Sequence, residues 1–389
     1  MKIALVHKQF ALKGGTEMVL YRTAEGLRDR GHEVHLFCGQ YSIPPPPRTS
    51  AHLVPCMRWP RTARLLTFAY FTPRVMDRYP CDVIMSFHPL PEQDLFRSGG
   101  GPHRVYIQKM SKNRSFWRRF WYWISPYHRS LIALEKRQMQ PGGCRKIIAV
   151  YQQGKKEIVD TYGLPEEKVA VIHNGVDHER FHPGRRLQEG KKIRESLGIP
   201  LDRPVVIFVG TGFRRKGLDR LLRIWGSDKF QGVYLLVVGD DARLRYYRRR
   251  WSRNQVIFVG PQSRVEDYYA AADLLVLPTI HDAFGNVVLE ALSSGLPVVT
   301  VAGLGSTDQL DGDLTEGILT DPDDPEELKS RILRQLDKSR WPSLSRAARQ
   351  VAEKYSWAKY FKELEVELNG LAKNHGSYPE TARLEEVRS

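Results

Sequence analysis

Short apolar runs recur along this chain with loops and helical patterns between them, and this repetition limits the folds it can adopt. The first run covers residues 2–6; a glycine pair at 14 and 15, a helical pattern and a second run at residues 33–37 follow. Within the runs, polar and apolar residues do not alternate, so both faces of each strand need a cover. Strands of this kind, separated by helices, predict a parallel sheet with helices on its faces.

The same pattern continues along the chain and begins again near residue 200. Further strand-like runs lie at residues 82–86, 146–150, 205–209, 233–238, 256–258, 274–277 and 298–301. We therefore predict two doubly wound, Rossmann-like α/β domains, residues 1–178 and 179–355. A closing amphipathic helix over 356–373 and a disordered polar tail over 374–389 should follow. Because ligands bind outside the carboxyl ends of parallel strands, a cleft between the domains would collect loops from both.

Length, cysteine content and charge restrict the functional class. The chain has 389 residues, 41% of them hydrophobic, which is enough for two cores. Its four cysteines lack zinc-site spacing and the density of a disulfide scaffold, and no apolar stretch reaches the roughly 18 residues of a spanning helix. We therefore expect a cytoplasmic protein. The net charge of +16 favours anionic partners, among them nucleotides, phosphorylated glycans, nucleic acids and anionic lipids.

The second predicted domain carries two carboxylates, Asp282 and Glu290, on either side of a glycine turn. A helix that starts near Gly285, Asn286 and Val287 offers backbone N–H groups and a positive dipole end, which suit a phosphate. Asp282 could then contact sugar hydroxyls, and Glu290 could accept from the vicinal hydroxyls of a ribose. Ordinary surface loops also carry two acids at this spacing, so the pair alone leaves both interpretations open.

The segment 282–299, DAFGNVVLEALSSGLPVV, resembles the acid-x7-acid motif of the retaining GT-B glycosyltransferases. This large family includes sucrose synthase-like and lipopolysaccharide core enzymes. Four other stretches agree in order and spacing: the glycine pair at 14 and 15, IHNGVD at 172–177, VGTGFRRKG at 209–217 and AAADLLVLP at 270–278. The first acid of the motif is usually glutamate, and here it is Asp282, one methylene shorter, which leaves the donor sugar open. The resemblance implies a GT-B fold with two Rossmann-like domains facing across a cleft.

The resemblance also implies a donor site. Arg215 and Lys216 match the basic pair that holds the donor diphosphate, where fixed cations stabilise the charge of the leaving group. A solvated basic loop is the alternative, because Arg214 is adjacent. The implied donor-binding residues are Gly14, Gly15, Arg215, Lys216, Phe284, Gly285, Asn286, Val287 and Glu290. With this charge supplied by side chains, we expect neither a metal nor a cofactor, and the nucleotide sugar, a UDP-sugar by preference, is a substrate.

The acceptor side is predicted in the first domain. The segment 86–96, SFHPLPEQDLF, follows a predicted strand and should lie at the rim of the cleft. It is similar to a stretch of the lipopolysaccharide core enzymes that ends in an aspartate followed by apolar residues. Asp94 is therefore a candidate to orient the acceptor or stabilise the sugar cation, and His88 is the alternative. With Asp282, these two residues form the predicted catalytic set.

Residues 109–129, KMSKNRSFWRRFWYWISPYHR, interleave six Lys and Arg residues with aromatic rings and contain no acid. Such a segment suits the headgroup region of an anionic membrane. The residues expected to face the membrane are Trp117, Arg118, Arg119, Trp121 and Trp123. A packed helix with a solvated basic face is the alternative.

Together these features predict a hexosyltransferase that acts with retention at the inner membrane as a peripheral protein. Glucose is the favoured sugar, and the acceptor is a membrane-associated glycan such as the lipopolysaccharide inner core. A nucleic-acid-binding protein would explain the charge but not the acid pair, and a nucleotide-sugar epimerase would explain the architecture but not the basic aromatic segment. The oligomeric state is not predicted.

Overall fold

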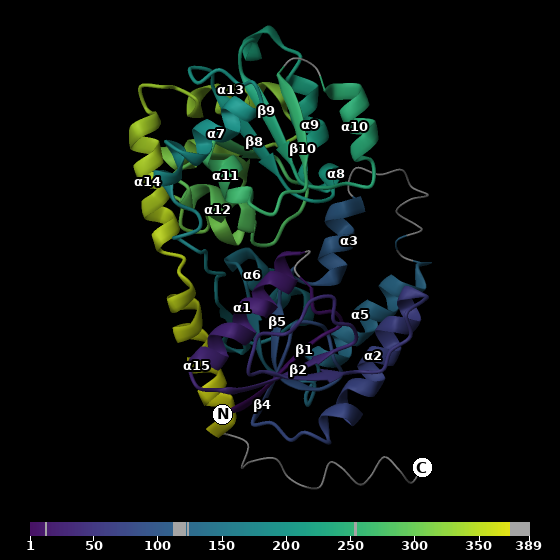
Figure 1. Cartoon of the computed structure of the whole chain (residues 1–389). Helices are drawn as coiled ribbons and strands as arrows, with labels where there is room; N and C mark the ends of the chain where they lie inside the picture. Colours follow the sequence, from purple (N-terminus) through teal and green to yellow (C-terminus); the bar gives the residue numbers. More distant parts are fainter. Residues whose placement is uncertain (12–13, 112–121, 123, 253–254, 374–389) are drawn as a thin grey trace, which may run out of the picture.

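The computed structural model describes residues 1–11, 14–111, 122, 124–252 and 255–373, and it forms two parallel sheets, each covered by helices (Figure 1). The first sheet has the order β3-β2-β1-β4-β5-β6-β7 and the second the order β10-β9-β8-β11-β12-β13. The predicted fold of two doubly wound α/β domains is confirmed. The predicted membrane-facing residues Trp117, Arg118, Arg119, Trp121 and Trp123, and the tail over 374–389, lie outside the described residues.

The strands follow the apolar runs of the sequence. Those of the first sheet are β1 (Lys2–His7), β2 (Glu33–Cys38), β3 (Ser50–Leu53), β4 (Val83–Ser86), β5 (Gln93–Ser98), β6 (Cys144–Ala149) and β7 (Val169–Val171). Those of the second are β8 (Val205–Val209), β9 (Tyr234–Val238), β10 (Val256–Gly260), β11 (Leu274–Leu277), β12 (Val298–Val301) and β13 (Ile318–Leu319). Strands β3, β5, β7 and β13 were not predicted from the sequence.

The helices divide between the two sheets. With the first sheet lie α1 (Gly15–Asp29), α2 (Arg61–Met76), α3 (His103–Ser111), α5 (Pro126–Met139) and α6 (Gln152–Tyr162). With the second lie α7 (Glu189–Ser196), α8 (Phe213–Lys216), α9 (Leu218–Ile224), α10 (Leu244–Trp251), α11 (Val265–Ala270), α12 (Asn286–Ser293), α13 (Pro325–Gln335) and α14 (Trp341–Glu353). None of the described helices combines the length and the apolar composition needed to cross a bilayer.

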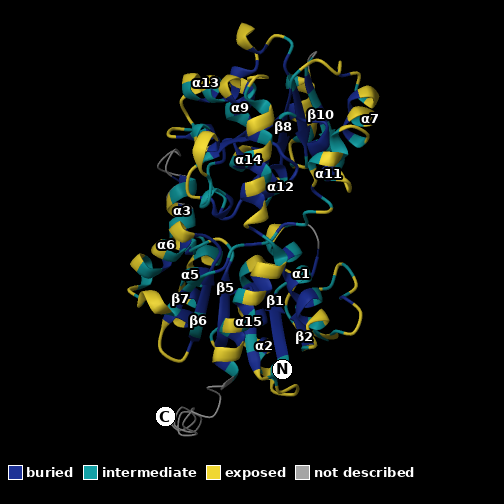
Figure 2. Ribbon diagram, turned by 90° about the vertical axis from the view of Figure 1, so that its left-hand side faces the viewer, coloured by how far each residue is buried: buried dark blue, intermediate teal, exposed yellow. Residues whose placement is uncertain are grey.

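Burial on both faces explains why the strands are continuously apolar. In β1, Ile3 and Leu5 pack into a core that includes side chains of α1, whereas Ala4 and Val6 pack into a second core with Phe68 of α2. Successive side chains of a strand point to opposite faces, so each face of this sheet has its own core. Figure 2 shows the buried strands in the middle of each domain and the exposed positions on the outer helices.

The strand orders place one switch point in each sheet. The chain runs outward from β1 through β2 to β3 and then returns to the other side of β1 with β4; β8 and β11 repeat this arrangement. Loops that follow the two central strands diverge at such a point and leave a crevice, which is where doubly wound sheets bind ligands. The segments after β1 and β4, and after β8 and β11, are therefore the places to look for a site.

The chain crosses between the domains twice, and the two crossings lie side by side. Val176 of the first crossing forms a parallel bridge with Ser356 of the second, and its N–H donates to Tyr355 O over 3.1 Å. A Cβ on Gly175 would lie 2.5 Å from Trp357 N, so the close contact requires glycine. After the second crossing, α15 (Trp357–Lys373) lies against the first domain beside α1 (Figure 1).

Candidate active site

The centre of the site is an ion pair between Lys216 and Asp282. Lys216 ends α8, which follows β8, and Asp282 follows β11, so both side chains stand at the switch point of the second sheet. Lys216 Nζ donates to Asp282 Oδ2, and both residues are largely buried. Burial alone would raise the pKa of Asp282, but the charge of Lys216, its hydrogen bond and the charge of Arg215 outweigh it and lower the pKa. Asp282 is therefore ionised at neutral pH.

Arg215 connects α8 to the loop after β11. Its guanidinium Nη1 donates to His281 O over 3.0 Å, and its own carbonyl accepts from Thr279 Oγ1 at 3.0 Å and from the Ile280 N–H at 2.8 Å. Gly217 permits this contact: its φ is +87°, and a Cβ there would lie 1.9 Å from Pro278 O. The two loops that carry the predicted donor residues are thus held rigidly together.

The glycine pair of the first domain meets the start of α12. A Cβ on Gly15 would lie 3.0 Å from Asn286 Nδ2, and Asn286 Oδ1 accepts from Asn174 Nδ2 over 2.8 Å. Gly15 is the first residue of α1 and Asn286 the first of α12, so the N-termini of two helices lie near each other. Both ends carry positive partial charge and N–H groups without intrahelical partners, which is a suitable environment for a diphosphate.

Arg97 extends this network into the first sheet. It lies near the carboxyl end of β5, is 2% exposed, and donates from Nη2 to Asn174 Oδ1. Its charge is therefore held near the meeting point of the two helices through one amide. Arg97 was not predicted as a site residue, although the three glycines at 99–101, which follow Ser98, indicate a loop at the end of a strand.

The remaining predicted donor residues lie on or before α12. Gly285 has a φ of +72°, and this turn starts the helix. The Phe284 ring is buried against Gly305 and Tyr355, so this side chain belongs to the core and only its backbone remains near the turn. Val287 O accepts from Tyr269 Oη over 3.2 Å.

Glu290 has an altered acidity. Its Oε2 accepts from the Tyr269 hydroxyl at 2.9 Å. Burial raises the pKa of Glu290 to about 7, although the Tyr269 hydrogen bond and the charges of Arg180 and Lys216 oppose the shift. Near neutral pH this carboxyl can therefore either donate to a ligand or accept from it.

This raised pKa predicts a pH-dependent stability. Because the folded state binds the Glu290 proton more tightly than the unfolded state, the contribution of Glu290 to stability should fall as pH rises from about 4.5 to about 7. Glu290→Gln lacks this loss. The free energy of unfolding of the variant, relative to that of the wild type, should therefore increase by up to about 3 kcal/mol between pH 4.5 and 8. Urea unfolding of both proteins across this range measures the effect. A difference that does not change with pH would contradict it.

A cavity of about 500 Å³ lies between the two domains. Its walls include the glycines at 99–101, His103 and Tyr127 from the first domain, and Arg215 and Asp282 from the second. Tyr106 of α3 also meets His281 edge to face, with ring centroids 5.3 Å apart. The cleft that the sequence predicted thus receives loops from both domains, and the Lys216–Asp282 pair lies at its edge.

The two predicted acceptor-side residues have different positions. His88 follows β4 at the carboxyl edge of the first sheet, is buried, and faces the cleft side. Asp94, however, is the second residue of β5 and therefore lies at the opposite edge, where Oδ2 accepts from the Ile84 N–H at 2.9 Å and Oδ1 pairs with Arg145 at 3.1 Å. The prediction that Asp94 borders the cleft was wrong, because the segment after residue 92 is a buried strand and not a loop.

Several cleft residues were missed by the sequence analysis. Glu135 of α5 is buried in the wall of the cavity, accepts from Tyr162 Oη at 2.8 Å, and has a pKa raised to about 7 by burial. Arg61 of α2 and Tyr127 of α5 also line it. Arg61 and Glu135 lie outside every motif, and Tyr127 lies in the segment 109–129, which was assigned to the membrane and not to the cleft. Among the described residues, no group of three or more His, Cys, Asp or Glu side chains is arranged to hold a metal.

Comparison with known proteins adds family matches over both domains. Residues 13–180 match the model of Glycosyltransferase Family 4, and residues 189–355 match the model of Glycosyl transferases group 1. An uncharacterized glycosyltransferase of Methanocaldococcus jannaschii is 26% identical over 93% of this chain and 96% of its own length.

Two relatives have informative names or structures. The lipopolysaccharide glucosyltransferase WaaG of Escherichia coli is 23% identical over 84% of this chain and 87% of its own. A crystal structure of WaaG matches with a TM-score of 0.80 at 21% identity, covering 94% of this chain and 99% of that one. The Anabaena protein HepE in complex with UDP-glucose matches with a TM-score of 0.71 at 18% identity, covering 95% and 100%.

Proposed function

Because the chain belongs to the glycosyltransferases that join a family 4 domain to a group 1 domain, we propose that it transfers a hexose from a UDP-sugar to a membrane-associated glycan with retention of configuration. The observation that carries the proposal is the buried Lys216–Asp282 pair, with Arg215 beside it, at the edge of the interdomain cavity. The complex of HepE with UDP-glucose supports UDP-glucose as the first donor to test.

In the proposed donor complex, the diphosphate lies between the N-termini of α1 and α12 and is bound by Arg215 and Lys216. Lys216 then exchanges part of its contact with Asp282 for the phosphate, and Asp282 accepts from hydroxyls of the sugar. As the acceptor oxygen attacks the anomeric carbon, the bond to the phosphate oxygen breaks and that oxygen takes the acceptor proton. The fixed cations stabilise the charge that develops on the leaving diphosphate.

This mechanism predicts that transfer survives chelation. Purified protein is incubated with UDP-glucose and a lipopolysaccharide inner-core glycan, which the similarity to WaaG makes the first acceptor to test, with and without EDTA. Equal rates are expected, because side chains supply the charge that a metal would otherwise bring. Rates lost with EDTA and restored by magnesium or manganese would contradict the metal-independent mechanism. Failure to turn over any nucleotide sugar would contradict the proposed function itself.

We also propose that the segment 109–129 binds the enzyme to an anionic membrane. Exposed apolar side chains at α2, which packs against the end of this segment, support the proposal. Helix α5 packs against α2, and in and before α2 Trp59, Leu66 and Tyr70 are 81%, 48% and 55% exposed. Apolar and aromatic side chains next to a basic segment suit a headgroup region. Lys109 itself is engaged elsewhere, since its Nζ pairs with Glu157 at 2.6 Å.

Arg118→Glu with Arg119→Glu should therefore release the protein from anionic vesicles. Each basic residue near such a surface contributes about 1 kcal/mol, so reversing two charges should weaken binding by at least about 30-fold. Co-sedimentation with vesicles that contain or lack anionic lipid measures this, and Arg245→Glu with Arg249→Glu, on the exposed face of α10, is the matched control. Membrane binding by this segment would be contradicted if the two double variants sedimented equally with anionic vesicles. It would also be contradicted if the wild type bound neutral and anionic vesicles equally.

A further inference from the structure

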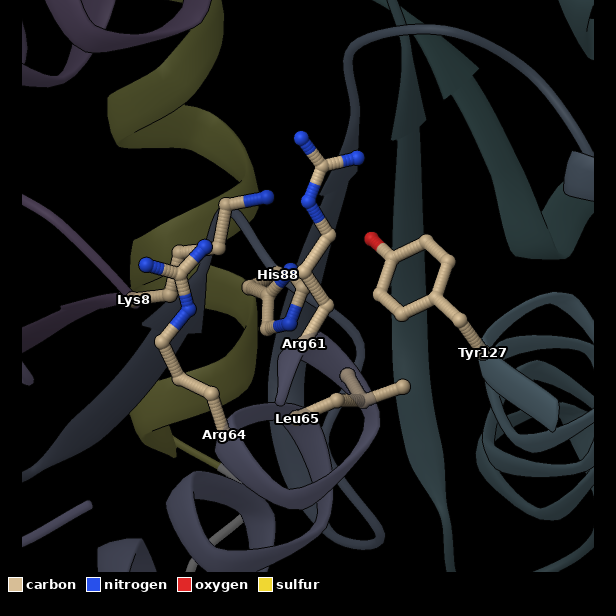
Figure 3. A pocket seen from close by; sticks show the side chains of 6 residues that line it. All are labelled: Lys8, Arg61, Arg64, Leu65, His88 and Tyr127. Carbon is tan, nitrogen blue, oxygen red and sulfur yellow. The ribbon is translucent and has the colours of Figure 1, made fainter. Parts of the chain in front are cut away.

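A second polar pocket lies at the switch point of the first sheet, across the cleft from the donor residues. Lys8 follows β1 and His88 follows β4, the two strands at which the strand order reverses. The pocket is lined by Lys8, Arg61, Arg64, Leu65, His88 and Tyr127. Figure 3 shows these side chains around the ring of His88, with the Tyr127 hydroxyl directed toward the pocket (Figure 3). The pocket is thus the counterpart, in the first domain, of the Lys216–Asp282 position in the second.

Three cations border this pocket without an ion pair. No carboxylate of the described residues lies within salt-bridge distance of Lys8, Arg61 or Arg64, whereas Lys216 at the same cleft is paired with Asp282. Burial lowers the pKa of Lys8, and the charges of Arg64 and Arg61 lower it further, while the charge of Glu17 opposes the shift without outweighing it. Like charges gathered in a partly buried place are unfavourable unless an anion compensates them.

The position of the arginines adds to this cost. Arg61 is the first residue of α2 and Arg64 lies in its first turn, which contains no acid. The N-terminus of a helix carries positive partial charge, so each cation there is unfavourable by about 0.3–1 kcal/mol. The sequence thus places two arginines where they destabilise their own helix, and the binding of an anion would account for that placement.

His88 provides a neutral polar group inside the pocket. It is 6% exposed, and its Nε2 has no hydrogen-bond partner among the described residues. Burial, together with the charges of Lys8 and other neighbours, lowers the pKa of His88 well below its ordinary value, so the ring is neutral. A buried polar nitrogen without a partner is unfavourable, and a ligand oxygen or hydroxyl would satisfy it.

The pocket connects with the interdomain cavity. Arg61 and Tyr127 line both spaces. The pocket has a volume of only about 10 Å³, whereas the cavity has about 500 Å³. The pocket can therefore receive about one oxygen atom of a ligand, and the rest of the substituent and the sugar that carries it have room only in the adjoining cavity.

We propose that Lys8, Arg61 and Arg64 bind a phosphate group on the acceptor, and that this enzyme therefore selects phosphorylated acceptors. The inference rests on the proposed function, since it assigns a class to the acceptor of that same cleft. The three cations more than compensate the two negative charges of a phosphate dianion, Tyr127 and His88 supply neutral contacts, and the sugar hydroxyl to be glycosylated would point across the cleft toward the donor.

The test measures the binding of glucose 6-phosphate, glucuronate and glucose by calorimetry, with saturating UDP present so that the donor position is occupied. Wild-type protein should bind glucose 6-phosphate at least about tenfold more tightly than either of the other two. In Arg61→Gln with Arg64→Gln, this preference should disappear while the affinity for UDP stays unchanged. The control is Arg245→Gln with Arg249→Gln, which removes the same charge from exposed positions of α10 and should bind as the wild type does.

A stability measurement distinguishes a binding role from a structural one. The Arg61 and Arg64 double variant should unfold at the same temperature as the wild type or higher, because it relieves the unfavourable charge at the start of α2. The inference would be overturned if the double variant unfolded at a lower temperature than the wild type or kept the preference for glucose 6-phosphate. It would also be overturned if the wild type bound glucuronate as tightly as glucose 6-phosphate. If UDP fails to bind, the donor part of the proposed function is contradicted, and the same titration without UDP still decides whether the arginines bind phosphate.

Discussion

Replacing Arg215 and Lys216 together by methionine should lower kcat/KM for transfer by at least about 10³-fold, because a single preorganised charge at a leaving group contributes 10²–10³-fold. Both cations act on the same diphosphate, so their effects are not expected to multiply fully. Methionine keeps the aliphatic stem of Lys216, which packs near Gly210, and thereby separates the loss of charge from the loss of packing. Initial rates at varied donor concentration give kcat and KM separately.

The matched control for this variant is Arg214→Met. Arg214 belongs to the same short helix, α8, but it is exposed and makes no ion pair with the described residues. It should retain wild-type kcat/KM. If the double variant kept more than about a tenth of the wild-type value, or if Arg214→Met lost as much, the loop would contribute only general positive charge and the diphosphate assignment would be wrong.

Gly217→Ala should reduce both stability and transfer, whereas Gly212→Ala should reduce stability slightly and transfer much less. Both glycines have positive φ, +87° and +72°, so alanine costs about 1–2 kcal/mol of backbone strain at either position. At Gly217, however, the new Cβ would lie 1.9 Å from Pro278 O, while at Gly212 no atom lies within 4 Å. The conflict at Gly217 should add about 1–3 kcal/mol and push α8 away from the loop that carries Asp282.

A displacement of about 1 Å at this point should cost about 10²-fold in kcat, because the basic pair and Asp282 would no longer meet the donor together. Thermal unfolding and steady-state rates of the two variants, measured side by side, test this. Equal losses of activity in both would mean that the αL conformation alone matters and that the contact between the two loops does not position the site.

The sequence predicted the architecture because burial on both faces leaves a strong signal. Every strand predicted from an apolar run is present, including β8 and β11, which precede the segments that carry Lys216 and Asp282. The failure at β5 has a physical cause. Its sequence, QDLFRS, is mostly polar, yet all six residues are buried, because Asp94 pairs with Arg145 and Arg97 with Asn174. A buried strand whose polar side chains bond to partners inside the protein has the same composition as a loop, so a sequence pattern does not distinguish the two.

The site could be predicted only where its residues lie in motifs. Asp282, Glu290 and the basic pair lie in the loops and helices that follow β8 and β11, so their neighbourhood could be inferred from chain order. Arg61 lies in no motif and Tyr127 in a segment that was assigned to the membrane, and only the packing of α2 against α5 brings them to the same pocket. Such proximity depends on tertiary contacts, and local patterns do not encode it.

The position of helix α15 has a consequence for co-translational folding. It begins at Trp357, after the whole second domain, yet Tyr360, Phe361, Leu364, Leu368 and Leu371 lie in the core of the first. A Cβ on Gly26 would lie 1.9 Å from the Phe361 ring, so α1 is shaped to receive that helix. During synthesis, the core of the first domain is therefore incomplete until about 200 more residues have been made after β7. At ordinary elongation rates this takes about 10–40 s. The core of the second domain contains no residue of α15, so the half of the cleft that is encoded first is completed last, and a chain shortened before α15 lacks part of the core of its first domain.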